Sequence, residues 1–170
     1  MIREDKQLLL QDLCARLPYG VIVDYKENEF ETPHWKITTI YPNTFNGWIG
    51  YDKRVGAGSE SGSRPFHIGE VKPYLRPMSS MTEEEKKELL NHVLGGEGVE
   101  YFHIAHDGSI DGNQETEQDL YNLNLHWLNF DPLTTSSYID WLNAHHFDYR
   151  GLIDRGLAIE ATEENNLYKD

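Results

Sequence analysis

The stretch HWKITTIY, residues 34–41, decides the fold class because its side chains alternate with a period of two. An extended chain would place one set on one face and the other set opposite: Trp35, Ile37, Thr39 and Tyr41, against Lys36, Thr38 and Ile40. The short runs YGVIVDY, residues 19–25, and GWIGYDK, residues 47–53, flank it. The three runs predict an antiparallel sheet.

Helical periodicity occurs in three other segments. Residues 3–17, ended by Pro18, place four leucines on one face: Leu9, Leu10, Leu13 and Leu17. A second helix should begin after Thr82, which forms a capping box with Glu85, and should stop at Gly95. The third, residues 134–146, begins with hydroxyl residues, and Ser137 and Asp140 have capping-box spacing.

The remaining segments complete an α+β domain. Residues 99–106 and 156–161 predict strands, and residues 72–77 predict an extended or single-turn connector. Residues 120–128 also fit helical spacing, but their stricter alternation favours a strand. We expect one domain over residues 1–170, with a mostly antiparallel sheet and about three helices. Residues 56–63, GAGSESGS, predict a flexible loop, and residues 162–170 a polar tail.

Composition excludes several classes of protein. A net charge of −14 disfavours direct binding to nucleic acids and to anionic lipid surfaces. No apolar run is long enough to span a membrane, and the acidic start MIREDKQ does not resemble a signal peptide. Cys14 is the single cysteine and cannot form an intramolecular disulfide. Together these features predict a cytoplasmic protein.

The segment WLNAHHFDYR, residues 141–150, offers the best candidate for catalysis. His145, His146 and Asp148 would supply the acid–base groups of a hydrolase-type enzyme. No Gly-x-Ser-x-Gly motif accompanies them, and Cys14 falls on an apolar helix face far away in sequence. The favoured alternative is structural, because histidines in a last helical turn suit the helix dipole and the orphan carbonyls. We then expect His145 to face the core with Trp141, and His146 to face solvent or backbone.

Two metal sites can also be considered. His103 and His106 lie three apart and would point to opposite faces of a strand. Asp107 with His126 across a hairpin, or His145 with His146, could still complete a His/Asp site. The acidic segment DGSIDGNQETEQ resembles a calcium loop, with four candidate ligands: Asp107, Ser109, Asp111 and Glu115. Its twelfth position is Gln118 instead of the bidentate glutamate, so a solvated acidic turn is the favoured interpretation. We expect no cofactor.

Three segments carry a resemblance to a known family: DLCARLPYGVIVDY (12–25), VKPYLRPMSSMTEEEKKEL (71–89) and YIDWLNAHHFDYRGLIDRGLAIEA (138–161). They resemble small uncharacterised proteins of gut Bacteroides-type bacteria and of their phages or mobile elements. The resemblance implies an intracellular bacterial setting and assigns no activity to any residue.

The sequence therefore favours an acidic, non-catalytic binding or accessory protein, compatible with a phage- or element-borne origin, and leaves its partner open, with another protein as one option. The alternatives are the histidine-based hydrolase and an acidic mimic of nucleic acid, which requires carboxylates along one face.

Overall fold

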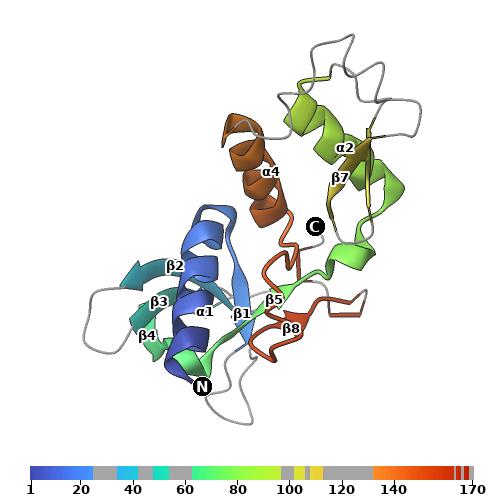
Figure 1. Cartoon of the computed structure of the whole chain (residues 1–170). Helices are drawn as coiled ribbons and strands as arrows, with labels where there is room; N and C mark the ends of the chain where they lie inside the picture. The colour runs from blue at the N-terminus through green and yellow to red at the C-terminus, as the bar shows by residue number, and fades with distance from the viewer. Residues whose placement is uncertain are drawn as a thin grey trace. The chain divides into compact units, whose positions relative to one another are not determined.

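The computed structural model describes residues 1–24, 34–41, 48–53, 63–96, 102–105, 108–112, 132–162, 164–165 and 167–168. The chain divides into two compact units. Unit 1 comprises residues 1–76 and 150–170, and unit 2 comprises residues 77–149. Three α-helices and mostly antiparallel strands occur in the described residues (Figure 1), which confirms the predicted α+β class. One domain over residues 1–170 stays a prediction.

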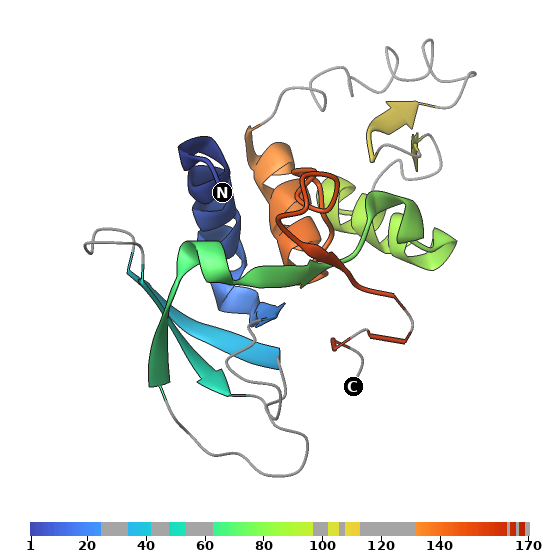
Figure 2. The same ribbon diagram turned by 90° about the horizontal axis from the view of Figure 1, so that it is seen from below.

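Unit 1 is built on a six-stranded sheet (Figure 2). Its strands are β1 (Ile22–Asp24), β2 (His34–Tyr41), β3 (Trp48–Lys53), β4 (Ser63–His67), β5 (Lys72–Leu75) and β8 (Ile159–Glu160). The order is β4-β3-β2-β1-β5-β8, and only β5 and β8 pair in parallel. β1 pairs with both β2 and β5, so the first strand lies inside the sheet.

The strand predicted at residues 34–41 forms, but its alternation breaks midway. The pairing with β3 shifts register between Ile37 and Thr39, which marks a β-bulge. A bulge adds one residue, so the side chains that follow it change faces. Ile40 accordingly packs with Trp35 and Ile37 in one core, whereas the sequence placed it on the opposite face.

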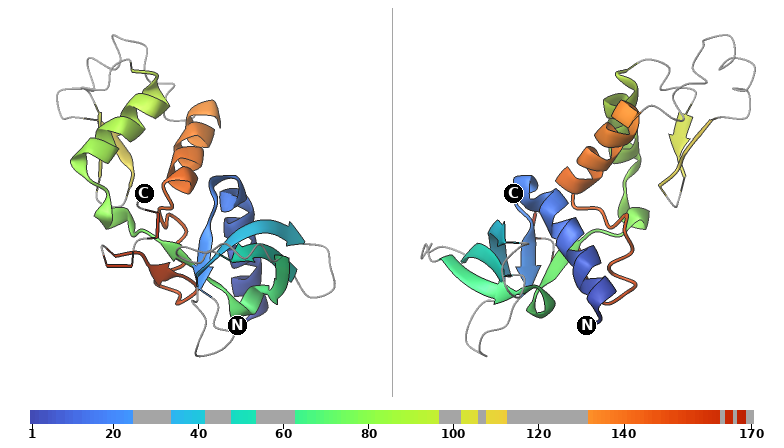
Figure 3. Two further views of the ribbon diagram at one scale, coloured as in Figure 1. Left: turned by 180° about the vertical axis from the view of Figure 1, so that it is seen from behind. Right: turned by 60° about the vertical axis from the view of Figure 1, so that its left-hand side comes forward.

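Helix α1 (Arg3–Arg16) supplies the second layer of unit 1 (Figure 3). Leu9 and Leu13 are fully buried and pack against strand residues such as Val23 and Trp35. Each buried leucine side chain stabilises the fold by about 1.5–3 kcal/mol. The predicted leucine face is confirmed. Cys14 is exposed, however, and does not lie on the apolar face.

Two strands of unit 1 were not expected. β4 begins at Ser63, so the last residue of the predicted loop 56–63 belongs to a strand, while residues 54–62 lie outside the described residues. β5 was interpreted as a connector because Pro73 and Pro77 bound the segment. It instead pairs with β1 on one side and with β8 on the other. A single 3₁₀ turn, η2 (Ile68–Glu70), joins β4 to β5.

Unit 2 contains helices α2 (Glu83–Leu94) and α4 (Pro132–Ala144) and the hairpin of β6 (Phe102–Ile104) and β7 (Ile110–Gly112) (Figure 3). Its core joins both helices to the hairpin: Met81, Leu89, Leu90, Val93, Phe102, Ile104, Trp141, Leu142 and Phe147. The capping box is confirmed: Glu85 N–H donates to the Thr82 hydroxyl at 3.2 Å, and Thr82 N–H donates to the Glu85 carboxylate at 2.9 Å. Gly95 ends α2 with a φ of 67°.

Two elements of unit 2 differ from the sequence-based prediction. α4 begins at Pro132, so Ser137 and Asp140 lie inside the helix and do not form its capping box. Proline suits the first helical turn, where its missing N–H leaves no bond unmade. β7 lies within the acidic segment that was interpreted as a solvated turn. Residues 120–128 lie outside the described residues. No described helix has the length and apolar character needed to cross a membrane.

Candidate functional site

The end of helix α4 positions both histidines of the predicted acid–base group. Phe147 N–H donates to the Leu142 carbonyl at 3.0 Å, and His146 N–H donates to the Asn143 carbonyl at 3.2 Å. This bond pair is the Schellman motif, which satisfies the last carbonyls of a helix. His146 takes the left-handed position of that motif, with a φ of 59°. Glycine usually occupies this position, and histidine is one of the side chains that tolerate it.

His145 is the half-exposed member of the pair. Its Nδ1 lies 2.9 Å from the Trp141 carbonyl, so the ring caps the helix end. The ring also stacks on the Trp141 indole with centroids 3.8 Å apart and an interplanar angle of 20°. The contact with Trp141 agrees with the sequence expectation. His146 is buried, with 5% of the residue exposed, so of the two expected environments, solvent and backbone, the structure excludes solvent.

The three proposed catalytic side chains do not form one group around His145. The polar contacts of His145 reach the Trp141 carbonyl and Glu88, whose Oε1 lies 3.8 Å from Nε2. Its hydrogen-bond, ion-pair and ring partners are thus Trp141 and Glu88 and not His146 or Asp148, which are both buried. Helix capping and burial are sufficient to explain where the three side chains lie. This is the structural interpretation that the sequence favoured.

The candidate metal ligands fall on or near the β6–β7 hairpin. Asp111 lies in β7 and pairs in register with His103 of β6, and both side chains are exposed. Ser109 precedes β7, while Asp107, Glu115, His106 and His126 lie outside the described residues. Among the described residues no three His, Cys, Asp or Glu side chains are grouped to hold a metal ion.

A polar group that the sequence did not indicate lies on one face of the unit 1 sheet. Asp24 of β1 pairs in register with His34 of β2, and the His34 Nε2 lies 3.1 Å from the Tyr74 hydroxyl of β5. Burial raises the pKa of Tyr74 to about 12, with a further contribution from the Asp24 charge. Burial also lowers the pKa of His34, which Asp24 opposes. At neutral pH the phenol is therefore protonated and the imidazole neutral, and the imidazole tautomer decides which of the two donates the hydrogen bond.

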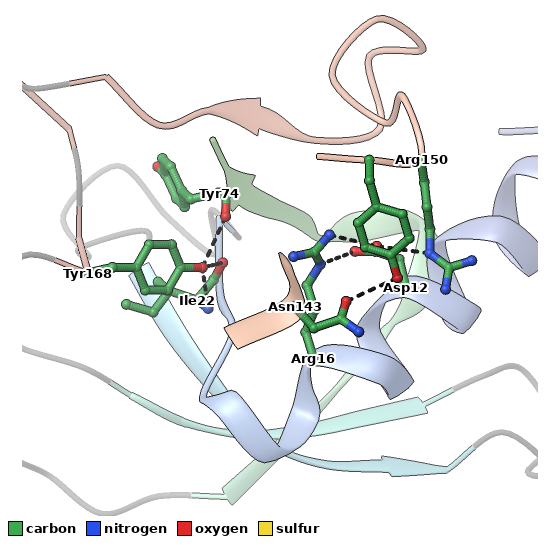
Figure 4. A network of polar contacts seen from close by, with 8 residues as sticks. Asp12, Arg16, Ile22, Tyr74, Asn143, Arg150 and Tyr168 are labelled. Atoms are coloured by element: carbon green, nitrogen blue, oxygen red, sulfur yellow. Dashed lines mark hydrogen bonds and ion pairs between the residues drawn. The ribbon is translucent and has the colours of Figure 1, made fainter. Parts of the chain in front are cut away.

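The C-terminal segment is anchored to the same part of the sheet (Figure 4). The Tyr168 hydroxyl accepts from Ile22 N–H at 3.0 Å and donates toward the Tyr74 carbonyl at 3.0 Å, which bridges β1 and β5. Leu167 and Tyr168 are half-buried and pack against Ile22, Tyr74 and Ala161. These two residues of the predicted polar tail thus cover an apolar patch of the sheet.

A buried ion pair on α1 forms the second network of Figure 4. The Asp12 carboxylate accepts two hydrogen bonds from Arg16, at 2.8 and 3.1 Å, and both side chains are fully buried. Arg150, which begins the C-terminal part of unit 1, places its Nε 3.4 Å from the same carboxylate. One carboxylate therefore holds two guanidinium groups and links α1 to the returning chain.

The charge of the protein is divided unequally between the units. Of the 29 acidic residues, 14 lie in residues 77–149, but of the 15 basic residues only 2 lie there. Unit 2 thus has a net charge of −12, and unit 1 a net charge of −2. Most of the net negative charge of the chain therefore belongs to residues 77–149.

No family model matches this chain, and neither a curated protein nor a solved structure matches it.

Proposed function

We propose that the protein is a non-catalytic binding protein whose residues 77–149 attach to a basic partner protein in the cytoplasm. The observation that carries this proposal is the division of charge, because unit 2 holds 14 acidic residues and only Lys86 and Lys87 as cations. Such an excess steers a positively charged surface toward unit 2 and repels nucleic acid and anionic lipid. The resemblance to element-borne bacterial proteins is compatible with this role.

Several described acidic side chains of unit 2 support the proposal because they are exposed. Glu84, Glu88, Asp111 and Asp140 are all exposed and come from α2, β7 and α4. Exposed carboxylates contribute little to folding stability, since surface ion pairs are worth about 0–1 kcal/mol. Their concentration in one unit is therefore better explained by binding than by stability.

The hydrolase alternative receives less support from the site. The His145 ring contacts the Trp141 carbonyl at the helix end and stacks on the Trp141 indole, and His146 and Asp148 are buried. General acid–base catalysis needs a titrating group within reach of substrate. The proposed function accordingly assigns these residues to the stability of unit 2.

The test compares matched charge changes in the two units of the full chain. One triple variant is Glu84→Gln, Asp111→Asn and Asp140→Asn in unit 2. The control triple is Asp154→Asn, Glu160→Gln and Glu164→Gln in unit 1, where all three side chains are also exposed. Each protein is titrated with lysozyme, a basic protein used as the probe, at low and at physiological salt.

We expect the unit 2 triple variant to bind the probe more weakly than the control and to show a smaller dependence on salt. Equal losses in the two variants would contradict the proposal, because net charge alone would then explain binding. If the chain displaces DNA from a DNA-binding protein, and the unit 2 variant does not, the acidic-mimic alternative is favoured.

A further inference from the structure

The end of α4 carries a stack of three aromatic rings that reaches the surface of unit 2. Phe147 is fully buried, Trp141 is 4% exposed, and the His145 side chain is 32% exposed. The Trp141 ring is nearly parallel to both others, at 12° to Phe147 with centroids 5.8 Å apart and at 20° to His145. The His145 ring is therefore held in place by the buried Trp141 ring on which it stacks and by its contact with the Trp141 carbonyl.

A carboxylate from the neighbouring helix lies beside this stack. Trp141 Nε1 donates to Glu88 Oε1 at 3.4 Å, and His145 Nε2 lies 3.8 Å from the same oxygen. The Glu88 side chain is 62% exposed, so its carboxylate is oriented by α4 and remains open to solvent. A planar ring and an oriented carboxylate therefore lie at one accessible point.

We infer that this point, formed by Glu88, Trp141 and His145, receives an arginine side chain of the basic partner. The inference rests on the proposed function and names the contact within it. A guanidinium group is planar and permanently charged, so it can stack on the imidazole and donate to the Glu88 carboxylate. Lysine presents a compact ammonium group that cannot use the ring face in the same way.

The surrounding charges favour a cationic ligand at this point. Glu84 lies one turn before Glu88 on α2 and is exposed, which adds negative charge on that side of the helix. Lys86 forms an ion pair with Glu83 at 2.7 Å. Lys87 is the immediate sequence neighbour of Glu88, and side chains at consecutive helix positions do not face each other.

The experiment titrates the full chain with two synthetic peptides of equal length and charge. One alternates arginine with serine, and the other alternates lysine with serine. Binding is measured by calorimetry for the wild-type chain and for Glu88→Gln, His145→Ala and the control Glu84→Gln. The control removes the same charge from the same helix, and a thermal melt of each variant confirms that it is folded.

We expect the arginine peptide to bind more tightly than the lysine peptide, and Glu88→Gln and His145→Ala to weaken it roughly three- to ten-fold. Glu84→Gln should have a smaller effect. If both peptides bind equally, or if Glu84→Gln matches Glu88→Gln, the arginine site is refuted while the proposed function stands. If neither peptide binds and the unit 2 triple variant also leaves lysozyme binding unchanged, both proposals fail.

Discussion

Removing the Asp12 carboxylate should destabilise unit 1 severely. Asp12 and Arg16 are both fully buried, and their two hydrogen bonds are 2.8 and 3.1 Å long. The change Asp12→Ala removes the carboxylate that accepts two hydrogen bonds from the buried Arg16 guanidinium. Breaking a buried pair in this way costs about 3–5 kcal/mol. Arg150 adds little to this figure, because its side chain is 27% exposed and its Nε lies 3.4 Å from Asp12.

The assay is thermal and urea denaturation followed by circular dichroism. For a chain of this length, 3 kcal/mol corresponds to a fall of roughly 6–12 °C in Tm. The double variant Asp12→Leu with Arg16→Met removes both charges and should recover most of the loss, since apolar replacements of buried pairs are often neutral or stabilising. A loss below about 1 kcal/mol for Asp12→Ala, or a double variant no better than the single one, would refute the reasoning.

Three further predictions concern single side chains. Thr82→Ala removes the acceptor of the Glu85 N–H and should lower stability by about 1 kcal/mol in urea denaturation, whereas Thr82→Ser should not. The pKa of Tyr74 is about 12 in the folded state and ordinarily 10, so on raising the pH the unfolded state loses the phenol proton first. The free energy of unfolding should therefore fall as pH rises from 10 to 12. The variant Tyr74→Phe should reduce that fall. Folding lowers the pKa of His34 below 6.5, so on lowering the pH the unfolded state binds a proton first. The free energy of unfolding should therefore fall as pH drops below 6.5. If thermal melts of His34→Gln show the same acid dependence as the wild-type chain, this prediction is wrong.

Features with local causes could be read from the sequence. The second helix is the clearest case, because Thr82, Glu85 and Gly95 lie within one short segment and determine its ends through bonds to adjacent backbone. The leucine face of α1 follows in the same way from spacing along one helix. The error at the start of α4 has a local cause as well, since hydroxyl residues suggested a cap where Pro132 already begins the helix.

Features that depend on strand pairing could not be read in this way. Asp24, His34 and Tyr74 come together only because β1 lies between β2 and β5, and nothing in residues 19–25 specifies that second partner. The bulge in β2 has the same origin, because a one-residue shift is visible only against β3. Tyr168 contacts Ile22 across 146 positions of the chain, whereas the composition of residues 162–170 indicated only a polar tail.

The division into units also changes what the net charge implies. A value of −14 suggests a chain that repels anions everywhere, and the exclusion of nucleic acid was drawn from it. Unit 1, however, holds 13 of the 15 basic residues against 15 acidic ones, because the chain returns to it after residue 149. Long-range repulsion therefore originates in residues 77–149. The proposed binding to a basic partner therefore predicts that a charge change in unit 2 weakens that binding, and the same change in unit 1 is the appropriate control.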